Sequence, residues 1–209
     1  AFSTALVPAI SAAKARKDKK TISEKTSFSL LISMLIGLPC TIGMCIFAEP
    51  ILNLLFPRQS DGAVILAISS LTIIFTILDQ TINGALQGYG KLRIPAISLG
   101  CGVIVKLILN LIIIPIPGIG VNGAAIASVA CHAVAFTIAI TSLIKNIKLN
   151  LTFSKFVLKP LFATVIMGIC SYFIYSKLLG ILGNKLAIIV AIAVAIIIYV
   201  LAIVVLKIF

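Results

Sequence analysis

Residues 92–116 read LRIPAISLGCGVIVKLILNLIIIPI, an apolar run with Arg93 at its start and a second charged residue, Lys106, near its middle. A helix of about 20 apolar residues crosses the roughly 30 Å hydrocarbon core of a bilayer. The run is continuous rather than alternating in polarity, which fits a helix and not a barrel strand. This stretch therefore predicts a transmembrane helix that carries an ionisable group near its centre.

Runs of the same kind occupy most of the chain. Of its 209 residues, 61% are hydrophobic and 11% are charged, whereas roughly 25% are charged in a soluble domain. This composition excludes a protein with a fully water-exposed surface. We predict an all-α fold, a polytopic transmembrane helix bundle. Six complete spans are expected at about 27–48, 62–87, 92–116, 121–144, 156–176 and 185–206.

Short polar segments between the spans define the expected organisation. Residues 1–13 lack an initiator Met and are expected to be the end of a truncated transmembrane helix. Basic cytoplasmic loops are predicted over 14–26 and 145–155. Four transmembrane helices then fill 27–144, and two additional transmembrane helices fill 156–209.

The basic residues fall mainly on one side of the predicted bundle. Threading six spans alternately through the bilayer places thirteen Lys and Arg residues on the side of the 14–26 segment. Only Arg58, Lys177 and Lys185 fall on the other side, and Lys106 lies inside a span. Basic residues favour the cytoplasmic side of a membrane. We therefore expect a multi-pass protein of the cell membrane with a cytoplasmic C-terminus, and we attribute the net charge of +12 to topology rather than to nucleic-acid binding.

Polar side chains gather in the second and third spans. Asp79 and Asn83 are four residues apart, as are Lys106 and Asn110, so each pair shares one helix face. A charge near a helix centre costs about 2.5–3.5 kcal/mol on insertion scales, so it should face a partner or water rather than lipid. We predict that Asp79, Asn83, Gln87, Lys106 and Asn110 line a substrate cavity. The alternative is a structural ion pair or amide network that fixes helix packing.

Small residues recur four apart in the same two spans. The pairs are Gly84 with Gly88, Ala96 with Gly100 and Ser98 with Gly102. Pairs of this kind let helices in a membrane approach closely, so we expect them to serve helix packing rather than to contact the substrate.

Patterns typical of catalysis or metal binding are absent from the sequence. His132 is the only histidine and has no second ligand at metal spacing, which favours a packing residue. The five cysteines show no CxxC pair. No nucleophile with its base and no phosphate-binding glycine loop is present. The sequence therefore predicts neither an enzyme nor a metal or cofactor site.

Four segments taken in order resemble one family of transporters. They are STALVPAIS at 3–11, LQGYGK at 86–91, the stretch from Lys106 to Asn110, and GIGVNGAA at 118–125. Together they resemble the second half of the polysaccharide exporter and lipid flippase (MOP) superfamily. Within it they are most similar to the stage V sporulation protein B branch, which is related to the lipid II flippases of peptidoglycan synthesis.

The resemblance implies a second lobe of a two-lobe flippase plus two extra C-terminal helices, with the N-terminal lobe missing from this chain. A central cavity would accept a lipid-linked sugar headgroup, and Lys106 and Asn110 would lie toward this cavity. Residues 156–206 would include a groove for the polyprenyl tail. The implied partners are a lipid-linked sugar precursor, membrane lipids and the missing lobe.

The function implied by the resemblance is transport of lipid-linked cell-wall or polysaccharide precursors across the cytoplasmic membrane by alternating access. Spore cortex peptidoglycan synthesis is one implied setting. An ion-coupled multidrug antiporter of the same superfamily is the first alternative. A membrane-embedded glycosyltransferase is the second, but it would need clustered acidic residues to hold a metal, and the loops offer only Asp18, Glu24, Glu49 and Asp61.

Overall fold

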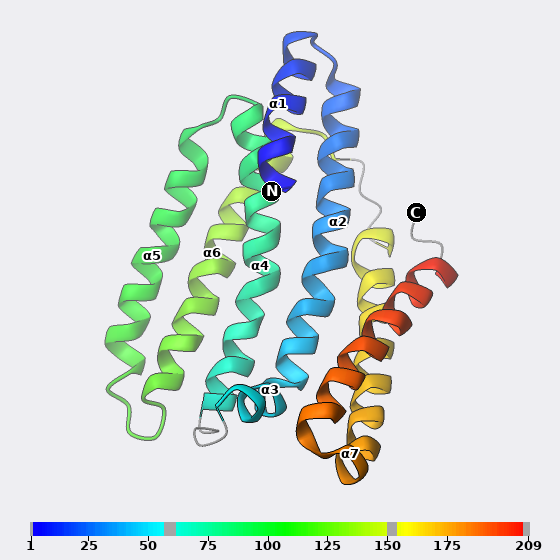
Figure 1. Cartoon of the computed structure of the whole chain (residues 1–209). Helices are drawn as coiled ribbons and strands as arrows, with labels where there is room; N and C mark the ends of the chain where they lie inside the picture. The colour runs from blue at the N-terminus through cyan, green and yellow to red at the C-terminus, as the bar shows by residue number, and fades with distance from the viewer. Residues whose placement is uncertain (1, 57–61, 150–153, 207–209) are drawn as a thin grey trace. The chain divides into compact units, whose positions relative to one another are not determined.

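The structure, a computed structural model, describes residues 2–56, 62–149 and 154–206, which are helical almost throughout (Figure 1). Within these ranges there is no strand, and six helices are long and apolar enough to cross a membrane. The predicted all-α fold with six spans is therefore confirmed. The helices are α1 Phe2–Ala15, α2 Lys19–Ile46, α3 Ala48–Leu55, α4 Ala63–Gly88, α5 Arg93–Ile113, α6 Val121–Asn146, η2 Ser154–Leu158 and α7 Lys159–Val205.

The chain forms two compact units. The first comprises Ala1–Gly37 and Thr72–Thr152, and the second comprises Leu38–Leu71 and Phe153–Phe209. Helices α2 and α4 each run from one unit into the other. This boundary differs from the expected division into four helices followed by two, because the segment Leu38–Leu71 clusters with the C-terminal helices.

Close helix approaches hold the first unit together. Ser98 on α5 is fully buried, and a Cβ atom added to Gly102 would lie 2.5 Å from the carbonyl oxygen of Cys131 on α6. A Cβ atom added to Gly88 on α4 would lie 2.8 Å from the carbonyl oxygen of Val7 on α1. Neither position has room for a larger residue, so these glycines let the helix backbones meet, as expected.

Helix α4 also contacts α2 and α6 in the first unit. The hydroxyls of Ser33 on α2 and Thr81 on α4 share a hydrogen bond of 2.6 Å. The rings of Phe75 on α4 and Phe136 on α6 lie 5.8 Å apart between centroids. Together with the α1 contact, these interactions show that α4 contacts α1, α2 and α6 in this unit.

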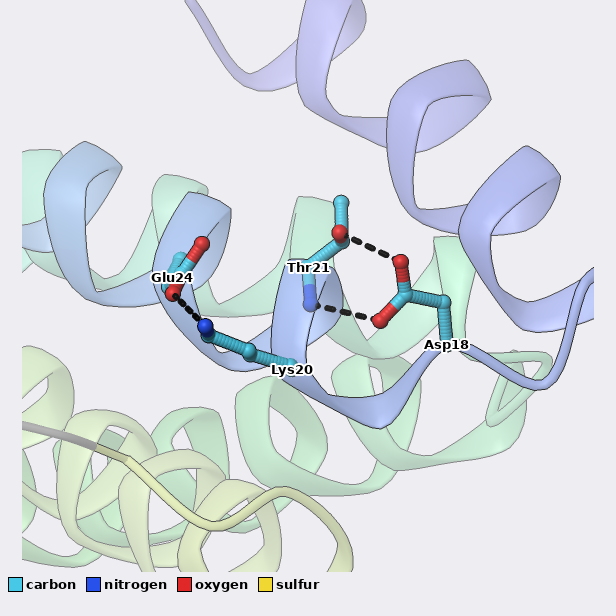
Figure 2. A network of polar contacts seen from close by, with 4 residues as sticks. All are labelled: Asp18, Lys20, Thr21 and Glu24. Atoms are coloured by element: carbon cyan, nitrogen blue, oxygen red, sulfur yellow. Dashed lines mark hydrogen bonds and ion pairs between the residues drawn. The ribbon is translucent and has the colours of Figure 1, made fainter.

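The basic segment is largely helical rather than a loop over 14–26. Only residues 16–18 separate α1 from α2, because Asp18 caps α2 at its start. One Asp18 carboxylate oxygen accepts the Thr21 backbone N–H at 3.0 Å, and the other accepts the Thr21 hydroxyl at 2.6 Å (Figure 2). These hydrogen bonds hold the pKa of the Asp18 carboxyl below its usual range. Helix α2 therefore begins before residue 27, the start expected for the first complete span.

The hairpin between α5 and α6 depends on two glycines with left-handed backbone. Gly118 has φ 91° and Gly120 has φ 45°. Glycine adopts these angles without the steric penalty that a side chain imposes. Helix α6 consequently begins at Val121, where the fourth span was expected to start.

The second unit contains a helical hairpin and a short helix. Helix α7 is broken at Gly183 (φ 70°, ψ 168°), which separates the spans Ser154–Ile181 and Gly183–Val205. The first arm thus extends beyond its expected end at residue 176. Between the first two expected spans lies the short helix α3, with Pro50 in its first turn, where proline is tolerated.

Contacts from both ends fix the hairpin of α7. The Lys159 ammonium donates to the carbonyl oxygen of Leu206 at 2.7 Å, which joins the two open ends. Near the turn, the Tyr175 hydroxyl donates to Asn184 Oδ1 at 2.8 Å, and Asn184 Nδ2 donates to the Pro50 carbonyl at 3.3 Å. These contacts tie α3 to the closed end of the hairpin. Arg58, Lys207 and residues 150–153 of the expected second loop lie outside the described residues.

The glycine contacts predict that two neighbouring Gly→Ala changes on α5 differ in their effect on stability. Gly102→Ala should lower the free energy of unfolding by about 1–3 kcal/mol, because the added methyl group collides with the Cys131 backbone. Gly100→Ala is the matched control, since nothing in the described structure lies within 4 Å of its Cβ position. Thermal unfolding of the full-length protein in detergent measures both. Equal stability of the two variants would contradict the close approach.

Candidate functional site

The first part of the candidate site lies on α4. Asp79 is only 8% exposed, and Asn83, one turn later, donates a hydrogen bond of 3.2 Å from Nδ2 to Asp79 Oδ2. The other carboxylate oxygen of Asp79 and the amide oxygen of Asn83 are buried without a hydrogen-bond partner among the described residues. The pair therefore has acceptor capacity that these residues leave unused.

The second part lies on α5. Lys106 and Asn110 are partly buried and one turn apart, and Asn110 Oδ1 is a further buried acceptor without a partner in the described ranges. Lys106 makes no ion pair with any described residue. Of the two structural alternatives to a cavity, Lys106 and Asp79 do not form the ion pair, whereas the Asn83–Asp79 hydrogen bond is one that an amide network would contain.

Helix α6 brings the two parts together. Gly102 lies one turn before Lys106, and its close approach to Cys131 presses α5 against α6. Helix α4 contacts α6 as well, through the rings of Phe75 and Phe136. We call Asp79, Asn83 and Lys106 the polar cluster. Its members lie on α4 and α5, both of which contact α6 within the first unit.

Two predicted residues lie at the edge of the polar cluster. Asn110 follows Lys106 by one turn on α5, and Gln87 follows Asn83 by one turn on α4. The side chain of Gln87 is exposed, in contrast to the buried Asp79. The structure therefore joins Asp79 to Asn83 directly, places Lys106 on a second helix that contacts α6, and leaves Gln87 near the end of α4.

His132, expected to serve packing, is partly buried on α6. One polar contact was missed in the sequence. Lys14 was counted only as a cytoplasmic charge, yet its ammonium donates to the Tyr89 carbonyl and lies 4.9 Å from the centroid of the Tyr89 ring.

The polar cluster contains groups that can bind a polar ligand. It offers one ammonium group together with carboxylate and amide oxygens that the described residues leave unsatisfied. Burying such groups unpaired is costly, so they require water or a polar ligand. Among the described residues, no three His, Cys, Asp or Glu side chains come together as a metal site would require. The arrangement can bind an anionic or hydroxyl-rich group.

Comparison with known families and curated proteins gives three findings. A family profile described as "Lipid II flippase MurJ" matches residues 1–191. The "Uncharacterized membrane protein YabM" of Bacillus subtilis (strain 168) is 34% identical over 132 residues, which cover 63% of this chain and 24% of that protein. The "Lipid II flippase MurJ" of the same organism is 25% identical over 116 residues, covering 53% of this chain and 21% of that protein.

Comparison with solved structures shows the same fold. The structure of "Lipid II flippase MurJ, inward closed conformation" matches with a TM-score of 0.78 at 19% identity, over 97% of this chain and 41% of its own. The aligned segments span less than a quarter of the length of the two curated relatives.

The hydrogen bond inside the polar cluster predicts a stability effect. Asn83→Ala should lower the free energy of unfolding by about 1–3 kcal/mol, because it strips the buried Asp79 carboxylate of its partner. The double variant Asp79→Leu/Asn83→Ala should regain most of the lost free energy of unfolding, because no buried carboxylate is then left without its partner. Gln80→Ala, on the exposed side of α4, is the control and should change stability by less than about 0.5 kcal/mol. Unfolding of the full-length protein in detergent provides the measurement, and an Asn83→Ala variant as stable as the Gln80→Ala variant would argue against the cluster.

Proposed function

The chain belongs to the lipid II flippase MurJ family, and from this premise we propose that it is part of a flippase for lipid-linked cell-wall or polysaccharide precursors. The chain is a multi-pass membrane protein with six apolar spans. Translocation by alternating access would let a polar headgroup cross the bilayer without meeting the desolvation cost of hydrocarbon. The headgroup would pass between this chain and the N-terminal lobe that the resemblance implies.

The observation that carries the proposal is the uncompensated charge of Lys106. Its ammonium lies in the middle of a span and has no anionic partner among the described residues. Retaining such a group is costly unless it faces water or a ligand. We propose that Lys106 binds the anionic part of the headgroup, while Asp79, Asn83 and Asn110 accept hydrogen bonds from its hydroxyl and amide groups.

The two arms of α7 supply the proposed groove for the polyprenyl tail. Their exposed side chains are apolar along both arms, including Phe162 and Phe173 on the first and Ile196 and Val200 on the second. Such surfaces suit a hydrocarbon chain that stays in the lipid phase. A role in spore cortex peptidoglycan synthesis is the finer setting that we propose for the same activity.

Removing the charge of Lys106 tests the proposed function. In the full-length protein, Lys106→Ala should lower precursor translocation at least about tenfold, because a charged hydrogen bond contributes about 1.5–3 kcal/mol. Lys106→Arg should retain most activity because it keeps the cation. Lys177→Ala is the control, because it removes a lysine near the end of a different span. The assay follows a labelled lipid-linked precursor across the membrane of reconstituted vesicles.

Translocation by Lys106→Ala at the wild-type rate would move Lys106 to a structural role. Efflux of cationic drugs driven by an ion gradient, without precursor translocation, would instead favour the multidrug antiporter.

The distribution of basic residues predicts the orientation of the chain. Green fluorescent protein fused after residue 209 of the full-length protein should fluoresce, since the C-terminus is proposed to be cytoplasmic. Alkaline phosphatase should be inactive at the same place and active when inserted after residue 56, at the end of α3. Active phosphatase at the C-terminus would contradict the proposed topology.

A further inference from the structure

A small cavity in the first unit lies among basic residues. Its volume is about 210 Å³, and it is lined by residues from three segments of the chain. Lys19 and Ile22 come from the start of α2, Tyr89 follows α4, and Lys145, Ile147 and Lys148 lie where α6 ends. We call this cavity the basic pocket. None of the proposed headgroup contacts lines it.

The lysines of the basic pocket have no anionic partners. Lys19, Lys145 and Lys148 make no ion pair with any residue that the structure describes. A fourth ammonium, that of Lys14, reaches the Tyr89 ring and carbonyl, and both of these partners are neutral. No carboxylate lines the cavity. Three lysines thus line a small space whose lining residues supply no counter-charge.

The acidic residues nearest in sequence already have other partners. Figure 2 shows Asp18 bound to both polar groups of Thr21, and Glu24 paired with Lys20. The Lys20–Glu24 distance is 3.9 Å. Neither of these two carboxylates lines the pocket.

A hydrogen bond positions the segment after α6 that forms one wall. The Ser23 hydroxyl on α2 donates to the Lys148 carbonyl oxygen. Ile147 has extended backbone, with φ −129° and ψ 122°, and its side chain is 3% exposed. The Ser23 hydrogen bond therefore joins the wall that carries Lys148 to α2, and the buried Ile147 side chain holds the same segment in place.

We propose that the basic pocket binds the phosphate group of an anionic membrane phospholipid. The lysines lie at helix ends on the proposed cytoplasmic side, where anionic lipid headgroups attract basic residues. The pocket also has apolar walls, formed by Ile22, Ile147 and the exposed Ile144. These side chains can contact the glycerol and acyl carbons of a lipid, whereas a free phosphate ion gains nothing from them.

The size of the pocket restricts the ligand. Sites for drug-sized molecules occupy about 300–1,000 Å³, and the basic pocket is smaller, at about 210 Å³. It suits one phosphate-bearing headgroup and is too small for the sugar headgroup of a transported precursor. The proposal therefore concerns a structural or regulatory lipid, and it stands whether or not the protein is a flippase.

The test is a lipid titration of the full-length protein in detergent, followed by native mass spectrometry. Short-chain phosphatidylglycerol is the anionic probe, and phosphatidylcholine and inorganic phosphate are the comparison ligands. Each lysine near an anionic headgroup contributes about 1 kcal/mol, or about fivefold in affinity. The Lys19→Gln/Lys145→Gln/Lys148→Gln variant should therefore bind phosphatidylglycerol about a hundredfold more weakly than the wild type.

A matched control removes the same charge from the same end of the protein. The control variant, Lys17→Gln/Lys20→Gln/Lys25→Gln, changes three exposed lysines that do not line the pocket. Its affinity for phosphatidylglycerol should stay within about threefold of the wild type, because contributions from distant charges are small. Replacing the three pocket lysines by arginine should preserve binding. If the triple Gln variant fails to fold, each single Lys→Gln change should still weaken binding about fivefold.

Equal affinity of the pocket and control variants for phosphatidylglycerol would overturn the proposal. The lysines would then serve only to set the orientation of the chain in the membrane. Displacement of phosphatidylglycerol by millimolar inorganic phosphate, or equal binding of phosphatidylcholine, would overturn the assignment to an anionic lipid.

Discussion

The hydrocarbon core of a membrane supplies no hydrogen-bond partners, and every feature of this protein has to satisfy that condition. Backbone groups meet it by forming helices, which is why six spans account for most of the chain. Chain reversals occur where glycine can adopt left-handed backbone, as at Gly120 and Gly183. Hydroxyl side chains donate to carbonyls one turn earlier, as Ser128 and Thr137 do, but side-chain oxygens of Asp79, Asn83 and Asn110 have no partner among the described residues. Their positions therefore indicate where water or a ligand is required.

The same glycine contact that packs two helices also places the charge. The backbones of α5 and α6 meet at Gly102 and Cys131, and Lys106 follows one turn later. This approach fixes the position of Lys106 relative to α6, which also contacts α4 through Phe136 and Phe75. Helix packing and the position of the charge are thus linked, and a change that separates α5 from α6 would disturb both.

Hydropathy predicted the spans well, because crossing the bilayer sets both their length and their composition. It predicted helix ends less well, since a helix can continue into water when a local cap stabilises it. Asp18 starts α2 in this way. Spacing along single helices grouped Asp79 with Asn83, and Lys106 with Asn110. It could not reveal Lys14 on Tyr89, because this contact joins segments far apart in the sequence.

The account depends most on Lys106 facing an aqueous passage. The direct measurement is labelling of Lys106→Cys by a charged, membrane-impermeant thiol reagent, in the full-length protein with its natural cysteines replaced. Leu111→Cys, at an outward position that is 77% exposed on the same helix, is the comparison. The account predicts rapid labelling at position 106, slowed by added lipid-linked precursor, and slow labelling at position 111. Labelling of position 106 only by a membrane-permeant reagent would contradict it.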